Sequence, residues 1–139
     1  MPQPFLIDKS ALARRAQPRV SDVVDPLHRR ALLAICAPTE FEMLYSARDK
    51  AEAARLRRFL NAFDYLSCDA DQWQRALEVQ QMAIDAGYHR ALSMADLLIA
   101  ATAERHRSVV LHYDGDFEMI ARLTGQPHQW VVPPGTADQ

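Results

Sequence analysis

Short, continuously apolar runs that alternate with helix-forming segments constrain the fold of this chain more than any other feature. The three clearest runs cover residues 4–7, 31–37 and 108–113. They are predominantly apolar instead of alternating strictly between apolar and polar, and strands of this kind are buried on both faces. Such strands are typical of a parallel sheet that helices cover from both sides. The sequence therefore predicts an α/β fold, a three-layer α/β/α sandwich with a central, mainly parallel sheet.

The segments between these runs have the periodicity and the boundary residues of helices. The predicted helices span 11–16, 19–30, 39–48, 51–62, 69–86, 93–106 and 116–123, and two further strands are predicted at 63–68 and 129–132. The chain contains no internal repeat and no long linker. A length of 139 residues suits one domain, so a single domain is expected over 1–139.

Composition excludes several classes of protein. The chain is 49% hydrophobic and 24% charged, which argues against disorder. No apolar run approaches the roughly 20 residues that cross a bilayer, and the first residues lack the pattern of a signal peptide. The two cysteines, Cys36 and Cys68, are too few for a disulfide framework. We therefore expect a cytoplasmic protein, and its net charge of −2 excludes a broadly basic surface that coats RNA.

Acidic residues stand at several junctions between a predicted strand and the following helix. Asp8 follows the first strand, Glu42 lies near the start of the helix after the second, and Asp96 lies in the first turn of helix 93–106. Asp114 follows the third strand, and Asp116 comes two residues later. Ligands of open parallel sheets bind beyond the carboxyl ends of the strands, where neighbouring loops converge. These acids are therefore expected to meet.

Helix capping could equally account for most of these acids. Segments 39–42 and 93–96 both have the spacing of a capping box. Asp8 and Asp114 are suitable N-caps, a role worth about 1 kcal/mol each. Glu40 is also available in place of Glu42, and periodicity alone does not choose between them.

Asp96 is hardest to explain as a cap. It is the only charged residue between positions 91 and 103, in a segment rich in leucine and alanine. A helix that is apolar on all sides is buried, and a buried carboxylate is costly unless it is paired or bound to a cation. Converging carboxylates with oxygen-only ligands favour Mg²⁺, for which Mn²⁺ can substitute. Such a site suits phosphodiester hydrolysis.

Four stretches of the chain, in this order, resemble the PIN-domain ribonucleases, and within them the VapC toxins of bacterial VapBC toxin–antitoxin pairs. They are LIDKSAL at 6–12, EMLYSA at 42–47, DLLIAATA at 96–103 and LHYDGDF at 111–117. The resemblance extends over essentially the whole chain, and the EMLYSA pattern favours Glu42 over Glu40. The chain departs from many relatives at His112-Tyr113, where a hydroxyl residue commonly precedes the fourth acid.

This resemblance implies a PIN fold over 1–139, a homodimer and Mg²⁺-dependent endoribonuclease activity on tRNA, rRNA or mRNA, which inhibits translation and growth. It implies a cognate VapB-type antitoxin as a partner. By the same resemblance the catalytic residues are Asp8, Glu42, Asp96 and Asp114, and the metal ligands are Asp8, Asp96, Asp114 and Asp116.

Further residues are weaker candidates. Ser10, Arg14 and Arg15 follow Asp8 closely and are predicted to contact the substrate, although Ser10 equally fits a helix cap. The five histidines show no paired metal-ligand spacing, so no ligand role is assigned to them. His112 and Tyr113 are candidates for RNA contact or for tuning a bound water, or else ordinary packed residues.

Two other functions compete with the nuclease. One is a catalytically silent PIN-like domain that binds a partner protein or RNA. The other is a phosphatase or receiver-like domain that uses Asp114 and Asp116. The latter ranks last because such chemistry commonly needs a later lysine, and no lysine follows Lys50.

Overall fold

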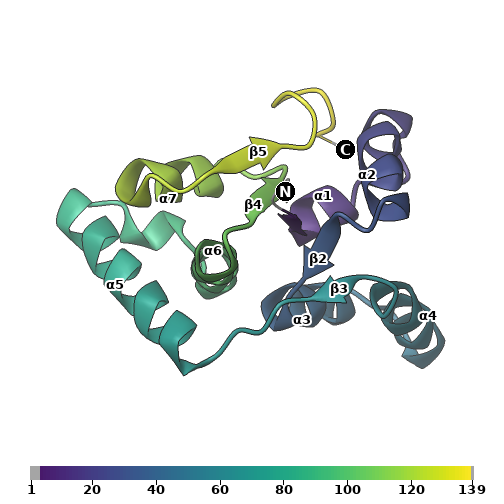
Figure 1. Ribbon diagram of the computed structural model, residues 1–139, viewed down its shortest axis with the longest axis horizontal. Coiled ribbons are helices and arrows are strands. Elements are labelled where there is room, and N and C mark those ends of the chain that lie inside the picture. The colour runs from purple at the N-terminus through teal and green to yellow at the C-terminus, as the bar shows by residue number, and fades with distance from the viewer. Residues whose placement is uncertain (1–3, 139) are drawn as a thin grey trace.

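A parallel sheet forms the centre of the computed structural model, which describes residues 4–138. Its strands, within that range, are β1 (Phe5–Ile7), β2 (Leu33–Ile35), β3 (Asp64–Tyr65), β4 (Val109–His112) and β5 (His128–Trp130). Their order is β3-β2-β1-β4-β5, and every neighbouring pair is parallel (Figure 1). The ends of the predicted domain, residues 1–3 and 139, lie outside the described range.

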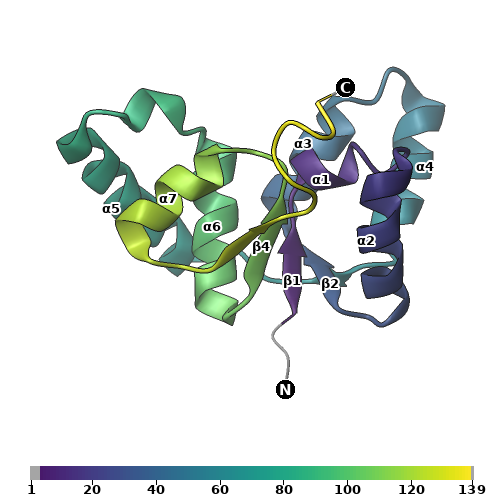
Figure 2. The same cartoon turned by 90° about the horizontal axis from the view of Figure 1, so that it is seen from above.

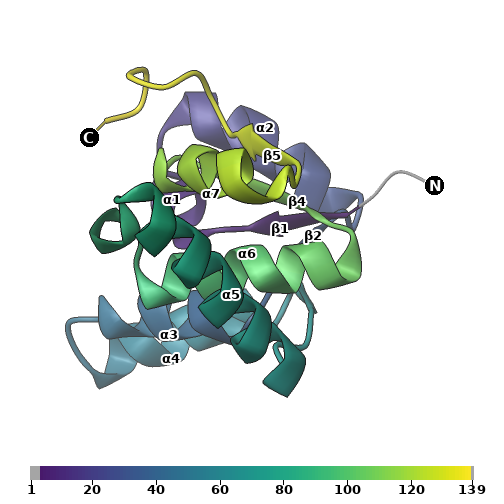
Figure 3. The same cartoon turned by 90° about the vertical axis from the view of Figure 1, so that its left-hand side faces the viewer.

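Helices cover both faces of this sheet. They are α1 (Lys9–Leu12), α2 (Pro18–Arg29), α3 (Ala37–Tyr45), α4 (Lys50–Leu60), α5 (Ala70–Ala86), the 3₁₀ turn η1 (His89–Ala91), α6 (Met94–His106) and α7 (Asp116–Thr124). Helices α5, α6 and α7 lie on one side of the strands, and α1 to α4 lie on the other (Figure 2). Figure 3, turned so that α5, α6 and α7 face the viewer, shows the strands behind these helices. The predicted three-layer α/β/α sandwich is confirmed.

Alternate residues of the central strands serve two separate cores, which explains why β1 and β2 are apolar along their whole length. Leu6 packs with α5, α6 and α7 in one cluster, whereas the next residue, Ile7, packs with α1 and α2 in the other. Both side chains are fully buried. A strand buried on both faces has no polar side to expose.

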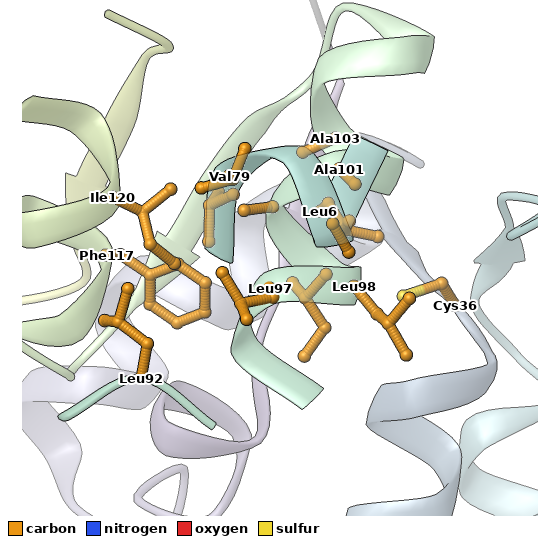
Figure 4. Close-up of a cluster of buried hydrophobic side chains, with 14 of the residues drawn as sticks. Leu6, Cys36, Val79, Leu92, Leu97, Leu98, Ala101, Ala103, Phe117 and Ile120 are labelled. Atoms are coloured by element: carbon orange, nitrogen blue, oxygen red, sulfur yellow. The ribbon is translucent and has the colours of Figure 1, made fainter. Parts of the chain in front are cut away.

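Helix α6 is the most deeply buried helix of the described chain. Its residues from Asp96 to Ala103 are all buried, and its side chains fill the space between α5 and the sheet. Figure 4 shows Leu97, Leu98 and Ala101 of α6 close to Leu6 and Phe117. Among residues 4–138, no helix is both long and apolar enough to span a membrane.

Several helix boundaries differ from the prediction. Helix α3 begins at Ala37, so Pro38 stands in its first turn and does not merely end the strand. Proline is favoured there because the first helical N–H groups have no intrahelical partner. Thr39 is therefore inside the helix, and the capping box predicted over 39–42 is wrong. The helix predicted at 11–16 ends at Leu12, and η1 has no counterpart among the predicted helices.

The carboxyl ends of the strands meet where the order of the sheet reverses. From β1 the chain crosses to β2 on one side, and the later strand β4 pairs with β1 on the other. Figure 2 shows β1 running toward α1 and α3 at this edge. Ligand sites of open α/β sheets form at such a reversal.

Candidate metal centre

Asp8 lies at the end of β1 and is almost completely buried, at 3% exposure. Its Oδ2 accepts a hydrogen bond from the backbone N–H of Ser10 at 2.9 Å, so Asp8 is also the N-cap of α1. Its Oδ1 is buried and has no hydrogen-bond partner among the described residues. Burial raises the pKa of Asp8. A buried carboxylate oxygen without a partner is costly, and a bound cation would remove that cost.

Asp96, Asp114 and Asp116 form a cluster close enough to Asp8 for their charges to interact. One carboxylate oxygen from each lies within 4.8 Å of the others. The N–H of Asp116 donates to Oδ1 of Asp114 at 3.0 Å, which fixes the turn between β4 and α7. The predicted cap of α6 is present as well, since Oγ of Ser93 accepts from the N–H of Asp96 at 3.1 Å. The N-cap of α7, however, is Gly115, so the capping role considered for Asp114 is wrong, whereas Asp8 does cap α1.

The carboxylates of this cluster carry like charges and lie close together in a partly buried place. Burial, reinforced by Asp8 and Asp114, raises the pKa of Asp96 to about 8. Burial also raises the pKa of Asp116, and Asp114 adds to this effect. Among the described residues, no salt bridge reaches any of these four aspartates. A divalent cation would compensate this charge and lower these pKa values.

Glu42 faces this cluster from α3, whereas Glu40 points elsewhere. Burial and the charge of Asp8 raise the pKa of Glu42, and the nearby ammonium of Lys9 acts in the opposite direction. Glu40 instead lies near Tyr65 on β3, where burial and then the charge of Glu40 raise the pKa of the Tyr65 hydroxyl. The structure thus brings Glu42, and not Glu40, toward Asp8. Lys9 is a site residue that no sequence pattern singles out, although it is adjacent to Asp8.

The predicted substrate-contact residues have partners inside the chain. Oγ of Ser10 accepts a hydrogen bond from the N–H of Tyr113 at 2.8 Å and so joins α1 to the end of β4. Arg14 donates to the carbonyl of Ala137, and Arg15 forms a 2.8 Å salt bridge with Asp25. The N-cap of α1 is Asp8, so the capping role considered for Ser10 is wrong. Substrate contact by Ser10, Arg14 or Arg15 stays a prediction.

His112 and Tyr113 are packed residues. His112 has no exposed surface, and burial together with His128 lowers its pKa to about 3. The hydroxyl of Tyr113 accepts from the N–H of Ala137 and donates to Asp138. Direct contact of His112 with RNA is excluded by this burial. The spacing of His112 and His128 carries no signal in the sequence, because β4 and β5 become neighbours only in the sheet.

An apolar groove of about 680 Å³ begins beside the acids. Lys9 and Glu42 line it together with Phe41, Tyr45 and Trp73. Phe41 and Tyr45 are unusually exposed for their size, at 77% and 91%. Exposed apolar patches of this kind commonly mark interaction surfaces.

Comparison with known proteins identifies the family. A family model described as PIN domain matches residues 5–123. The chain belongs to the PIN-domain family. It is 44% identical to Ribonuclease VapC21 and to Ribonuclease VapC51 of Mycobacterium tuberculosis, each over 134 residues that cover 96% of this chain and 97% of the relative. The resemblance to VapC proteins is thereby confirmed, and the receiver-like alternative is set aside.

Solved structures share the same PIN fold. The chain superposes on a structure of DNA-bound VapBC from Salmonella typhimurium with a TM-score of 0.77, covering 94% of this chain and 100% of that one at 16% identity. VapBC2 from Rickettsia felis bound to a promoter DNA fragment gives a TM-score of 0.74 at 15% identity, with 92% and 99% covered. At these identities the likeness concerns the fold.

Proposed function

We propose that this PIN-domain protein is a metal-dependent endoribonuclease that acts as the VapC-type toxin of a toxin–antitoxin pair. The observation that carries the proposal is the cluster of Asp96, Asp114 and Asp116 next to the buried, unpartnered carboxylate oxygen of Asp8, without a compensating salt bridge among the described residues. The 44% identity to proteins named Ribonuclease VapC supports the reaction. Inhibition of translation and growth through cleavage of tRNA, rRNA or mRNA is part of the proposal.

The four aspartates fit a hard divalent cation. All the available ligand atoms are carboxylate oxygens, which suit Mg²⁺, with Mn²⁺ able to substitute. When bound, such a cation polarises a phosphodiester and lowers the pKa of water. Asp8 would supply its unpartnered Oδ1, and Asp96, Asp114 and Asp116 would supply the clustered oxygens.

Glu42 has a different role in this proposal. It is half-buried at the mouth of the apolar groove, and its pKa is raised by burial and by Asp8. A carboxylate with a raised pKa accepts a proton more readily, which suits a general base for an attacking water. Asp8 and Asp96 are more deeply buried than Glu42 and are suited to holding a bound cation in place.

RNA cleavage tests the assignment. With Mg²⁺ present, the native chain should cleave RNA, and Asp8→Asn, Asp96→Asn and Glu42→Gln should each reduce the rate by at least about 100-fold. Glu40→Gln is the matched control, because Glu40 lies on the same helix but faces Tyr65, and it should retain the native rate. Undiminished cleavage by Asp8→Asn and Asp96→Asn contradicts the proposal.

The partners follow from the same family. The structural neighbours include VapBC complexes from Rickettsia felis and Salmonella typhimurium, and we propose a VapB-type antitoxin and an RNA substrate for this chain in the cytoplasm. We also propose that two copies pair through the apolar face formed by α3, α5 and the start of α6. The exposed side chains of this face are Phe41, Tyr45, Trp73, Leu77 and Met94.

Calorimetry with Mn²⁺ separates the nuclease from a catalytically silent PIN-like domain. The four aspartates should bind the ion near neutral pH, and binding should be accompanied by proton release because Asp96 must lose its proton. A chain that folds but binds no Mn²⁺ favours the silent domain.

A further inference from the structure

A buried pair of histidines supports the loop that carries Asp114 and Asp116. His112 is the last residue of β4, and its Nδ1 accepts a hydrogen bond from the backbone N–H of Asp114 at 3.1 Å. Its Nε2 lies 2.9 Å from Nδ1 of His128, the first residue of β5. The two rings also stack, with centroids 5.1 Å apart. A backbone amide and a second strand thus hold the two nitrogens of one buried ring.

This arrangement determines where the proton of His112 resides. A backbone N–H can only donate, so the Nδ1 atom that faces Asp114 has no proton. The proton of the neutral ring is therefore on Nε2, which donates to Nδ1 of His128.

The ring of His112 is also held against rotation. Its centroid lies 5.0 Å from that of Phe117 in α7 and 5.0 Å from that of Trp130 in β5. The indole N–H of Trp130 donates to Glu118 at 2.9 Å, which fixes the indole in turn. A ring packed in this way presents its Nδ1 to Asp114 in one orientation, because rotation would require several neighbours to move.

We propose that His112 is a positioning residue of the metal centre, held in its Nε2–H tautomer by the N–H of Asp114 and by His128 together, and that it orients Asp114 through the Asp114 backbone. Movement of Asp114 would also displace Asp116, because the N–H of Asp116 donates to Oδ1 of Asp114. Groups that orient metal ligands in this way commonly change metal affinity 10- to 100-fold when they are removed. The inference rests on the proposed function, since it requires that Asp114 holds a cation.

Two substitutions of His112 distinguish positioning from packing. His112→Phe keeps a ring of similar size but removes the acceptor for Asp114. His112→Asn fills the space less well, yet its Oδ1 stands near the position of Nδ1 and can accept the same hydrogen bond. In calorimetry with Mn²⁺, His112→Phe should weaken binding about 10-fold or more. The Mn²⁺ affinity of His112→Asn should stay within about 3-fold of that of the native chain.

The outcomes of this titration are separable. If His112 only fills space, His112→Asn should weaken Mn²⁺ binding more than His112→Phe does. That result overturns the positioning role of His112. Equal affinities for Phe, Asn and the native chain overturn it as well. A native chain that folds but binds no Mn²⁺ contradicts the proposed function itself.

Nitrogen NMR of the histidine rings tests the tautomer in the native chain without any substitution at His112. Without metal, His112 should show a protonated Nε2 and an unprotonated Nδ1. A proton on Nδ1 overturns the proposal, because that nitrogen could not then accept from Asp114. His128→Leu removes the acceptor for Nε2–H, so it should mix the two tautomers of His112 and weaken Mn²⁺ binding, whereas an unchanged tautomer contradicts the role of His128.

Discussion

At the scale of single residues, Asp96 shows how one buried carboxylate connects stability to metal binding. Its pKa of about 8 means that the metal-free chain holds a proton there at neutral pH. In the unfolded chain an aspartate titrates near pH 4. Between these two values the folded state binds more protons than the unfolded state, so the free energy of unfolding falls as the pH rises from about 4 to about 8. The raised pKa values of Asp8, Asp116 and Glu42 act in the same direction.

Asp96→Asn should remove most of this dependence, since the amide resembles the protonated acid. In chelator at pH 8 the variant should be more stable than the native chain by about 1 kcal/mol or more, and the two should be nearly equal at about pH 4.5. Urea unfolding at the two pH values measures the difference. Added Mn²⁺ should stabilise the native chain but not Asp96→Asn. If the native chain and the variant are equally stable at pH 8, Asp96 has an ordinary pKa.

At the scale of elements, the segment after β5 is attached to the loop beside the metal centre. The hydroxyl of Tyr113 bonds both the N–H of Ala137 and the carboxylate of Asp138. The guanidinium of Arg14 donates to the carbonyl of Ala137 at 2.8 Å and lies over the Tyr113 ring. Ala137 is buried as a result, at 2% exposure. This segment therefore connects α1, the end of β4 and the chain beyond β5.

Tyr113→Phe should weaken this attachment without disturbing the ring packing. Loss of hydrogen bonds to a buried N–H and to a carboxylate should lower the free energy of unfolding by about 1–3 kcal/mol. Urea unfolding measures this loss, and hydrogen exchange should show faster exchange at the amide of Ala137. Unchanged exchange there would mean that Tyr113 does not hold the segment. Thr136→Val is a suitable control, because the Thr136 hydroxyl bonds only locally, to Pro133.

At the scale of the whole molecule, one apolar face lacks a partner within the described chain. Trp73 and Leu77 are one helical turn apart on the outer side of α5, and Phe41 and Tyr45 are one turn apart on α3. Glu42 and Lys9 lie at the border of this face. A second copy on this face would therefore cover the approach to the acids from one side.

Charge substitutions on this face should separate the two copies. Phe41→Glu and Trp73→Glu each place a charge in the proposed apolar contact, so they should convert a dimer into a monomer in analytical ultracentrifugation. Arg122→Glu on the exposed side of α7 is the control and should leave the dimer intact. A native chain that is already monomeric at high concentration contradicts the pairing.

Much of this architecture was predictable from the chain alone. Runs such as 108–113 indicate strands buried on both faces, and such strands require helices on both sides. The uninterrupted apolar helix around Asp96 indicated a buried carboxylate, because a lone charge in such a segment is buried together with its apolar neighbours. These signals are local, so they can be read from neighbouring residues in the sequence.

The convergence of the strand-end acids was predictable, but other individual contacts were decided only by the tertiary structure. Periodicity left Glu40 and Glu42 open, and only the EMLYSA resemblance favoured Glu42. The proximity of Glu42 to Asp8 depends on the rotation of α3 and on its start at Ala37, two residues before the predicted one. The pairing of His112 with His128 depends on β5 lying beside β4, and neither residue has a pattern that reveals its partner. Contacts between distant segments arise from the order of strands in the sheet and from the packing of helices against it, whereas the sequence pattern reports only how each segment is buried.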